Sequence, residues 1–147
     1  MHIVKSIEIN CSKEELWAWL TEFEKLQKWN STILKEEHIS SGEVGPGYVT
    51  RVLIKEGKSE NWYENEILKY DTPSYLQISL KGANLGKGPM YIDYKISEKE
   101  NSVKLDYENN WKPVGLMLWL FHPIINKMAS KNTDKALAAL KECAENS

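Results

Sequence analysis

One segment dominates the sequence: residues 113–145 read PVGLMLWLFHPIINKMASKNTDKALAALKECAE. From residue 125 onward, side chains suited to a protein interior recur at the i, i+3, i+4, i+7 spacing of a helix, and charged side chains occupy the opposite side. The members of this inward face are Ile125, Met128, Ala129, Asn132, Ala136, Ala139, Leu140 and Cys143. The spacing predicts a long amphipathic helix around which the rest of the chain packs.

Two prolines and an apolar run mark the first part of this helix. Pro113 suits a first helical turn, whereas Pro123 removes a backbone donor and predicts a kink or break beside His122. Residues 114–121 are apolar nearly all round, so a helix carrying them cannot bury every side chain against one sheet. We expect residues 111–123 to form the mobile rim of a cavity. The alternatives are that the preceding helices cover this segment as core, or that residues 111–121 dock on another protein.

The N-terminal part predicts one strand and two short helices. Residues 2–9 alternate around isoleucines, which is typical of a half-buried strand. Ser12 and Glu15 form a capping box, in which each side chain binds the free backbone N–H of the other residue. The helix that begins there is followed by a second one, which ends near residues 29–31.

The remainder reads as strands separated by turn signals, at residues 33–39, 48–54, 61–70, 75–80, 90–96 and 103–111. A run of strands linked by hairpins implies an antiparallel sheet with the helices on one face. The sequence therefore predicts an α+β fold over residues 1–147 as a single domain. Its curved sheet of about seven strands would wrap around the long C-terminal helix.

Period-2 alternation predicts which strand side chains face that helix. In the last two strands the inward set is Met90, Ile92, Tyr94, Ile96, Val103, Leu105, Tyr107, Asn109 and Trp111. The solvent-facing set there is Asp93, Lys95, Lys104, Asp106 and Glu108. Residues 61–69 turn Tyr63, Asn65 and Ile67 inward, and Glu60, Glu64 and Glu66 outward. Asn109 and Asn132 either orient a ligand or bond to each other or to buried water.

Composition and charge exclude several classes of protein. Apolar residues make up 41% and charged residues 27% of the 147 positions, as in soluble globular proteins. A net charge of −2 and a single arginine, Arg51, argue against a nucleic-acid partner. Arg51 either binds an acidic ligand group or pairs with Glu64 or Glu66 outside the cavity. No apolar run approaches the ~20 residues that cross a bilayer, so we expect no stable membrane insertion.

The remaining motifs point to neither a metal nor a cofactor. The three histidines are scattered without acidic or cysteine partners at ligand spacing. Gly82, Gly86 and Gly88 lie between strands without a following helix, so they predict a hairpin loop rather than a phosphate cradle. Cys11 and Cys143 are far apart and predict free thiols in a reducing compartment. We expect a cytoplasmic protein.

Several strings resemble the START-like helix-grip superfamily, and within it the polyketide cyclase/dehydrase and lipid-transport branch. They are SIEINCSKEELWAWLTEFEKLQKWN at residues 6–30, GEVGPGYVTRV at 42–52, EILKYDTPSYLQISL at 66–80, and VKLDYENNW before the terminal helix. The resemblance covers nearly the whole chain. It implies a curved sheet gripping the last helix, with a cavity that in relatives holds lipids, polyketides or other apolar molecules. The branch has no shared catalytic motif to carry over.

We therefore expect binding or transport of an apolar or aromatic small molecule, without metal or nucleotide and with no covalent chemistry assigned. The candidate cavity residues are Tyr63, Asn65, Met90, Ile92, Tyr94, Leu105, Tyr107, Asn109, Trp111, Met117, Phe121, Met128 and Asn132. Tyrosine and asparagine suit a pocket that is apolar with a few orienting hydrogen bonds, and plain core filling is the alternative. An enzyme of the cyclase or dehydratase type is the second reading. Its acid or base would be Glu64 or Glu66 only if that strand's alternation were reversed.

Overall fold

The computed structural model describes residues 1–85, 88–112 and 115–147. Its strands are β1 (His2–Ile9), β2 (Ile33–His38), β3 (Val49–Glu56), β4 (Ser59–Asp71), β5 (Tyr75–Lys81), β6 (Met90–Glu98) and β7 (Val103–Asn110). Its helices are α1 (Lys13–Thr21), α2 (Phe23–Trp29), the short 3-10 helix η1 (Ala83–Leu85) and α3 (Leu116–Glu145).

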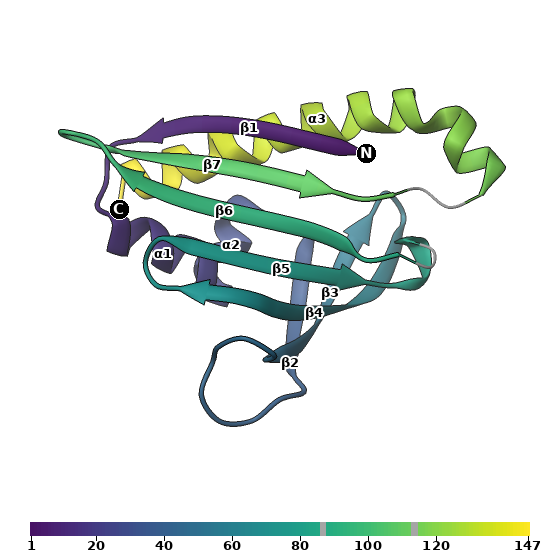
Figure 1. The fold of residues 1–147 in the computed structure, drawn as a ribbon, viewed down its shortest axis with the longest axis horizontal. Helices are drawn as coiled ribbons and strands as arrows, with labels where there is room; N and C mark the ends of the chain where they lie inside the picture. The colour runs from purple at the N-terminus through teal and green to yellow at the C-terminus, as the bar shows by residue number, and fades with distance from the viewer. Residues whose placement is uncertain (86–87, 113–114) are drawn as a thin grey trace.

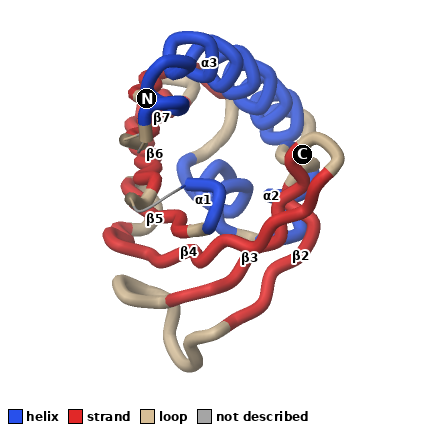
Figure 2. The backbone as a smooth tube through the Cα atoms, turned by 90° about the vertical axis from the view of Figure 1, so that its right-hand side faces the viewer, coloured by secondary structure: helices blue, strands red, loops and turns tan. Residues whose placement is uncertain are grey.

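The seven strands form one antiparallel sheet in the order β1-β7-β6-β5-β4-β3-β2. Figure 1 shows α3 running beside β1 and β7, with α1 and α2 near the C-terminal end of this long helix. Seen end-on, the sheet is a curved wall, α3 lies along its open side, and α1 and α2 lie between them (Figure 2). This is the helix-grip arrangement predicted from the sequence.

Local sequence explains where the first two helices begin and end. The Ser12 hydroxyl accepts a hydrogen bond from the Glu15 backbone N–H at 3.1 Å and caps α1, which is one half of the predicted capping box. The return bond to the Glu15 carboxylate is not formed among the described residues. Glu22 separates α1 from α2 in an extended conformation, and Asn30 ends α2. The indole N–H of Trp29 donates to the Trp19 carbonyl oxygen at 2.9 Å, and both side chains are buried. The two helices are thereby held together.

The long helix continues through Pro123, so the predicted break is absent. Pro123 lacks the N–H that would bind the Trp119 carbonyl, yet the turns on both sides stay helical. In Figure 1 the first turns of α3 bend away from the line of the rest, as expected where one bond of the ladder is missing. Pro113 and Val114 lie outside the described residues.

The inward face of α3 is confirmed for six of its eight predicted residues, which pack against the apolar clusters of the fold: Ile125, Ala129, Ala136, Ala139, Leu140 and Cys143. It is wrong for the other two. Leu137, Leu140 and Ala144 are its buried residues, whereas Asn132 is exposed and Met128 is 62% exposed. The sequence pattern counted alanine as apolar to the same degree as leucine, although the larger side chain buries more surface. In the structure the bulky Leu137 faces the sheet, and this turns the helix so that residues at the margin of the predicted stripe, such as Met128, leave the interior.

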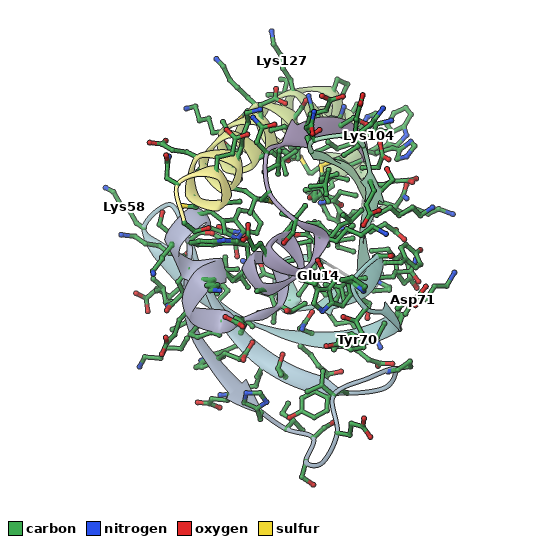
Figure 3. The ribbon with its side chains drawn as sticks, turned by 90° about the vertical axis from the view of Figure 1, so that its left-hand side faces the viewer. Glu14, Lys58, Tyr70, Asp71, Lys104 and Lys127 are labelled. Atoms are coloured by element: carbon green, nitrogen blue, oxygen red, sulfur yellow. The ribbon has the colours of Figure 1, made fainter. Side chains whose placement is uncertain are left out.

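The predicted alternation holds in the last strands. In β7 every second residue from Val103 to Asn109 is buried, and Ile92, Tyr94 and Ile96 are buried in β6. Figure 3 shows the charged side chains of Lys58, Asp71 and Lys127 pointing away from the body of the molecule. Asp93 departs from the expected solvent exposure. It lies on the outer face but is buried, because the Tyr75 hydroxyl and the Gln77 amide donate to its carboxylate.

Two apolar clusters stabilise the fold. The larger one joins β1, β5, β6, β7, α1, α2 and the second half of α3, with Leu16, Leu105 and Leu140 fully buried. A smaller cluster gathers Val52, Tyr63, Leu85 and Trp111, against which Leu118 and Ile125 of α3 pack. The start of α3 is therefore anchored at one end of the sheet, separately from the rest of the helix. Within the described residues, no helix is both long enough and apolar enough to cross a membrane.

Candidate functional site

A cavity of about 300 Å³ lies on the concave side of the sheet, between β2–β6 and the ends of α1 and α2. Its apolar wall consists of Leu20, Leu26, Ile33, Val44, Val52, Ile54, Ile67, Leu76, Ile78, Leu80 and Ile92. Its polar side chains are Thr21, Asn30, Thr32, Glu36, His38, Tyr48, Thr50, Asn65, Tyr70 and Tyr94. We call this space the inner cavity.

A second hollow of about 850 Å³ adjoins the inner cavity on the side of α3. The two spaces share five lining residues, Asn30, Thr32, Ile54, Ile92 and Tyr94. We call it the outer hollow, and it is bounded by the end of α2, the β3–β4 turn, the strands β1, β6 and β7, and residues 129–137 of α3. The two spaces are therefore neighbours that share part of one wall.

Seven of the thirteen predicted site residues line these two spaces. Asn65 lines the inner cavity, Ile92 and Tyr94 line both spaces, and Met90, Tyr107, Asn109 and Asn132 line the outer hollow. The strand residues among them share the concave face, as period-2 alternation predicts.

Three other candidates are core residues. Leu105 is fully buried in the larger cluster. Tyr63 and Trp111 belong to the smaller cluster, where the Tyr63 hydroxyl donates to Glu56 and the Trp111 indole donates to the Leu85 carbonyl at 3.0 Å. These side chains lie on the predicted face but outside both spaces, a position that alternation alone does not reveal.

The last three candidates lie on the surface. Met117, Phe121 and Met128 are 70%, 50% and 62% exposed and line neither space. With Leu120 and Ile124 they form an apolar stripe along the outer side of α3, away from Leu118 and Ile125. We call this set the outer stripe. The alternative that α1 and α2 cover this segment as core is wrong for these residues.

A chain of three polar side chains lies at one end of the inner cavity. Nε2 of His38 lies 3.2 Å from Oε1 of Glu36, and Nδ1 of His38 lies 2.8 Å from the Tyr48 hydroxyl. Glu36 is partly buried, and this burial raises the pKa of its carboxyl, although His38 opposes the shift. A carboxyl with a raised pKa beside a cavity is a common feature of functional sites.

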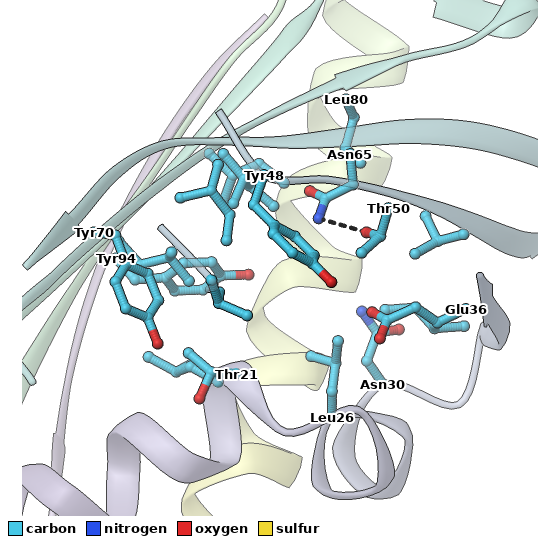
Figure 4. Close-up of a pocket in the computed structure, with 18 of the residues that line it drawn as sticks. Thr21, Leu26, Asn30, Glu36, Tyr48, Thr50, Asn65, Tyr70, Leu80 and Tyr94 are labelled. Atoms are coloured by element: carbon cyan, nitrogen blue, oxygen red, sulfur yellow. Dashed lines mark hydrogen bonds between the residues drawn. The ribbon is translucent and has the colours of Figure 1, made fainter. Parts of the chain in front are cut away.

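Two further polar residues stand above Glu36 (Figure 4). The Asn65 side-chain amide donates to the Thr50 hydroxyl at 3.1 Å, and Thr50 is buried. The Asn65 side-chain oxygen is buried, and it accepts no hydrogen bond from any residue that the structure describes. An unpaired buried acceptor costs about 1–3 kcal/mol.

The tyrosines at the junction of the two spaces are packed and neutral. The rings of Tyr94 and Tyr107 meet edge to face, with centroids 5.5 Å apart, and burial raises the pKa of both hydroxyls. The Asn109 amide donates to the Tyr107 hydroxyl at 3.2 Å and to the Met90 sulfur at 3.4 Å. Asn109 therefore bonds to these neighbours and not to Asn132, which is exposed.

The three charged residues that the sequence suggested as possible ligand contacts, Glu64, Glu66 and Arg51, lie outside the cavity. Tyr63, Asn65 and Ile67 face inward, which sends Glu64 and Glu66 to the other side of β4. Arg51 is also on that side, where its guanidinium stacks 4.1 Å from the Trp62 ring centre and pairs with Glu37 at 3.1 Å. The partner is thus Glu37 of β2 rather than Glu64 or Glu66. Among the described residues, no three His, Cys, Asp or Glu side chains gather to hold a metal ion.

Sequence reasoning missed Glu36, His38 and Tyr48. For Glu36 and His38 the reason is a register shift between Ile33 and Lys35, which changes the alternation within β2. Ile33 and Glu36 both line the cavity, although strict period-2 counting places them on opposite faces. No residue of β2 is typical of a β-bulge, so the sequence does not predict the register shift. The consecutive charged side chains of this strand ordinarily indicate a solvent-exposed edge strand. Tyr48 continues the inward set of Thr50 and Val52, so period-2 counting back from β3 could have found it.

Residues 1–145 match the protein family described as polyketide cyclase / dehydrase and lipid transport. The fold is similar to that of a protein from Thermus thermophilus, with a TM-score of 0.78 and 11% identity, over 98% of this chain and 97% of that one. Ara h 8.0201 gives a TM-score of 0.74 and 12% identity over 100% and 99% of the two chains. The Aha1 dimer from Colwellia psychrerythraea gives 0.68 and 17% over 99% and 96%. No curated protein matches the sequence.

Proposed function

The chain belongs to the polyketide cyclase / dehydrase and lipid transport family, and we propose that it binds an apolar or aromatic small molecule on the concave side of the sheet, in the inner cavity beside α1 and α2. Of the two spaces, α3 borders the outer hollow. The observation that carries the proposal is the inner cavity, whose wall is mostly aliphatic with a few polar groups at one end. Sites for small organic ligands have this composition, and volumes of roughly 300–1,000 Å³ are usual. Free thiols at Cys11 and Cys143 support a cytoplasmic location.

An enzyme of the cyclase or dehydratase type is the second candidate. The observation that favours it is the Glu36–His38 pair on the cavity wall, because general acid–base catalysis needs a titratable group next to the substrate. Ligand binding is the better-supported function. The family description covers both catalysis and lipid transport, and the Glu36–His38 pair alone does not define a reaction.

Docking of another protein through residues 111–121 is a third candidate. Its support is the exposure of Met117, Trp119 and Phe121 on α3. Trp111 does not contribute to such a surface, since it is buried in the smaller cluster.

The test of the proposed function is binding of a neutral apolar dye, diphenylhexatriene, measured by its fluorescence. The Ile78→Phe variant places a larger side chain in the inner cavity, next to Ile67 and Ile92 in the sheet. Val4→Phe is the matched control, because Val4 is an exposed aliphatic residue of β1. We expect Ile78→Phe to weaken dye binding at least several-fold and Val4→Phe to leave it unchanged. Equal binding by all three proteins would place the dye outside the inner cavity and contradict the proposal.

Native mass spectrometry of the protein purified from its own source complements the dye assay. The expected result is an apolar small molecule that travels with the protein and is lost from Ile78→Phe. Stoichiometric zinc or a nucleotide in its place would contradict the proposed ligand class.

A further inference from the structure

Glu36 is the only Asp or Glu among the described residues that line the inner cavity. Its neighbour Glu37 points to the other face of the sheet, where it pairs with Arg51. The two carboxylates thus differ in surroundings although they are adjacent in the chain. Neither lysine nor arginine lines the inner cavity in the part of the chain that the structure describes, so the Glu36 charge is balanced only if His38 is protonated.

The one side-chain hydrogen bond of His38 among the described residues forms without a charge on its ring. Nδ1 lies within hydrogen-bond distance of the Tyr48 hydroxyl, which donates to it when Nδ1 is unprotonated. Nε2 then carries the proton and lies 3.2 Å from Oε1 of Glu36, a close electrostatic contact. In this arrangement the imidazole is neutral, so the carboxylate keeps its full negative charge. Oε2 of Glu36 makes no hydrogen bond with another described residue and is available to a ligand.

A second acceptor without a partner lies in the same cavity. The Asn65 amide nitrogen donates to the Thr50 hydroxyl. The buried Asn65 oxygen accepts no hydrogen bond from a described residue. Figure 4 shows Asn65, Thr50 and Glu36 on one side of the cavity, with the Tyr48 ring beside them. Two free acceptors and one negative charge match a group that donates several hydrogen bonds and is positively charged. They repel a carboxylate or a phosphate.

We propose that Glu36 and Asn65 form an acceptor site that selects ligands with a protonated amino group on an apolar or aromatic body. The inference rests on the proposed ligand-binding function and adds the chemical class of the ligand. The amino group binds at Glu36 and Asn65, and the apolar body lies along Ile67, Ile78 and Ile92. The faces of aromatic rings also attract cations, and the Tyr48, Tyr70 and Tyr94 side chains line the same space.

The test compares three probes that share one chain and differ at one end: decylamine, decanol and decanoate. Each displaces diphenylhexatriene from the protein at pH 8. We expect decylamine to compete at a concentration roughly ten- to hundredfold lower than decanol, because its hydrogen bonds are charge-assisted. Decanoate is expected to be the weakest competitor.

Variants then assign the preference to the two residues. Glu36→Gln removes the charge and keeps the shape, so decylamine should lose most of its advantage over decanol. Glu37→Gln is the matched control, one position away and on the outer face, and should keep the wild-type order. Asn65→Ala removes the second acceptor and should weaken decylamine several-fold more than it weakens decanol, which isolates its contribution to the amino group from any general effect on the cavity wall. Circular dichroism confirms that each variant is folded.

The outcomes separate this inference from the function on which it rests. If decanol displaces the dye and decylamine is no better, or if Glu37→Gln acts like Glu36→Gln, the acceptor site is refuted and the binding function stands. If dye binding is insensitive to Ile78→Phe and none of the three probes competes, both proposals fail. A preference for decylamine that disappears in Glu36→Gln and persists in Glu37→Gln supports the site.

Discussion

The carboxyl group of Glu36 destabilises the unliganded fold at neutral pH. Burial raises its pKa, so the folded chain holds this proton more tightly than the unfolded chain does. Stability therefore falls as the pH rises from the unfolded value through the raised folded value, and the whole penalty is present above it. A group that costs stability and faces a cavity is consistent with selection for binding.

The first prediction follows from this penalty. Glu36→Gln should increase the free energy of unfolding at pH 8, by less than about 1 kcal/mol because the side chain is only partly buried. The gain should vanish at acidic pH, below the unfolded-state pKa, where this carboxyl is protonated in both states. Urea unfolding at the two pH values measures it, with Glu37→Gln as control. A gain of equal size at both pH values would show that the carboxylate charge is not its cause.

The second prediction separates two buried tyrosines. Tyr94 lines both spaces, and its hydroxyl has no hydrogen-bond partner among the described residues, whereas the Tyr63 hydroxyl donates to Glu56 outside the inner cavity. Tyr94→Phe should weaken decanol binding by about 0.5–1.5 kcal/mol with little change in stability. Tyr63→Phe should lower stability and leave decanol binding unchanged. If the protein proves to be an enzyme and Tyr94 its acid, turnover should instead fall by about 10²–10⁴.

Single residues of the site were predictable where the strand is regular. Asn65, Ile92 and Tyr94 line the cavity because alternation along β4 and β6 is unbroken there. Glu36 was not predictable, since the register shift in β2 depends on how this strand pairs with β3. That pairing is a tertiary property which no local pattern of β2 contains.

At the scale of elements, α3 carries two apolar faces of different consequence. The inner face holds Leu140, which is fully buried, and the outer stripe holds Met128, which is 62% exposed. The third prediction is that Leu140→Ala lowers the free energy of unfolding by about 2–5 kcal/mol, the usual cost of emptying a buried leucine site. Met128→Ala should change it by less than about 0.5 kcal/mol. Denaturant unfolding measures both, and similar losses would mean that the outer stripe is covered in solution.

The fourth prediction concerns the proline inside this helix. Pro123→Ala restores the N–H that binds the Trp119 carbonyl and should raise stability by about 1–3 kcal/mol. Amide exchange of residues 116–122 should slow accordingly. Pro46→Ala, in the exposed segment between β2 and β3, is the control and should give no gain.

Amide exchange also tests the prediction that residues 111–123 form the mobile rim of a cavity. Fast exchange of residues 115–121 that slows when decylamine binds would support a mobile rim at the cavity. Protection equal to that of residues 128–140 without ligand would rule it out.

The elements themselves were largely predictable. All seven strands and the three α-helices lie where alternation, capping and turn residues indicate, with small shifts at their ends. The inward face of α3 was predicted except at Met128 and Asn132, which are exposed, and at Leu137, which was left out, because neighbouring rotations of an alanine-rich helix look equally amphipathic. Packing of Leu137 against the sheet selects one of them.

At the scale of the whole molecule, the inner cavity is built from segments far apart in the chain. Residues 20–33, 36–54, 65–80 and 92–94 contribute to its wall, so it exists only when the sheet and the first two helices are assembled. The fifth prediction is that a bound ligand raises global stability. At 100 times its dissociation constant, decylamine should add about 2.7 kcal/mol to the free energy of unfolding. Thermal unfolding of wild type and Ile78→Phe measures it, and an equal rise in both would indicate binding elsewhere.

The position of β2 at the margin of the sheet has a consequence for kinetics. β2 pairs with β3 alone, and its first residues are held to α2 by the Gln27 amide, which donates to the carbonyls of Ile33 and Leu34 at 3.1 and 3.0 Å. The far end of the strand, with Glu36 and His38, lacks this tether. Detaching one marginal strand needs less free energy than unfolding the domain. We therefore expect the wall that holds the ligand's charged end to open more readily than the inner strands of the sheet. We expect the rate at which this strand detaches to limit how long a ligand stays bound.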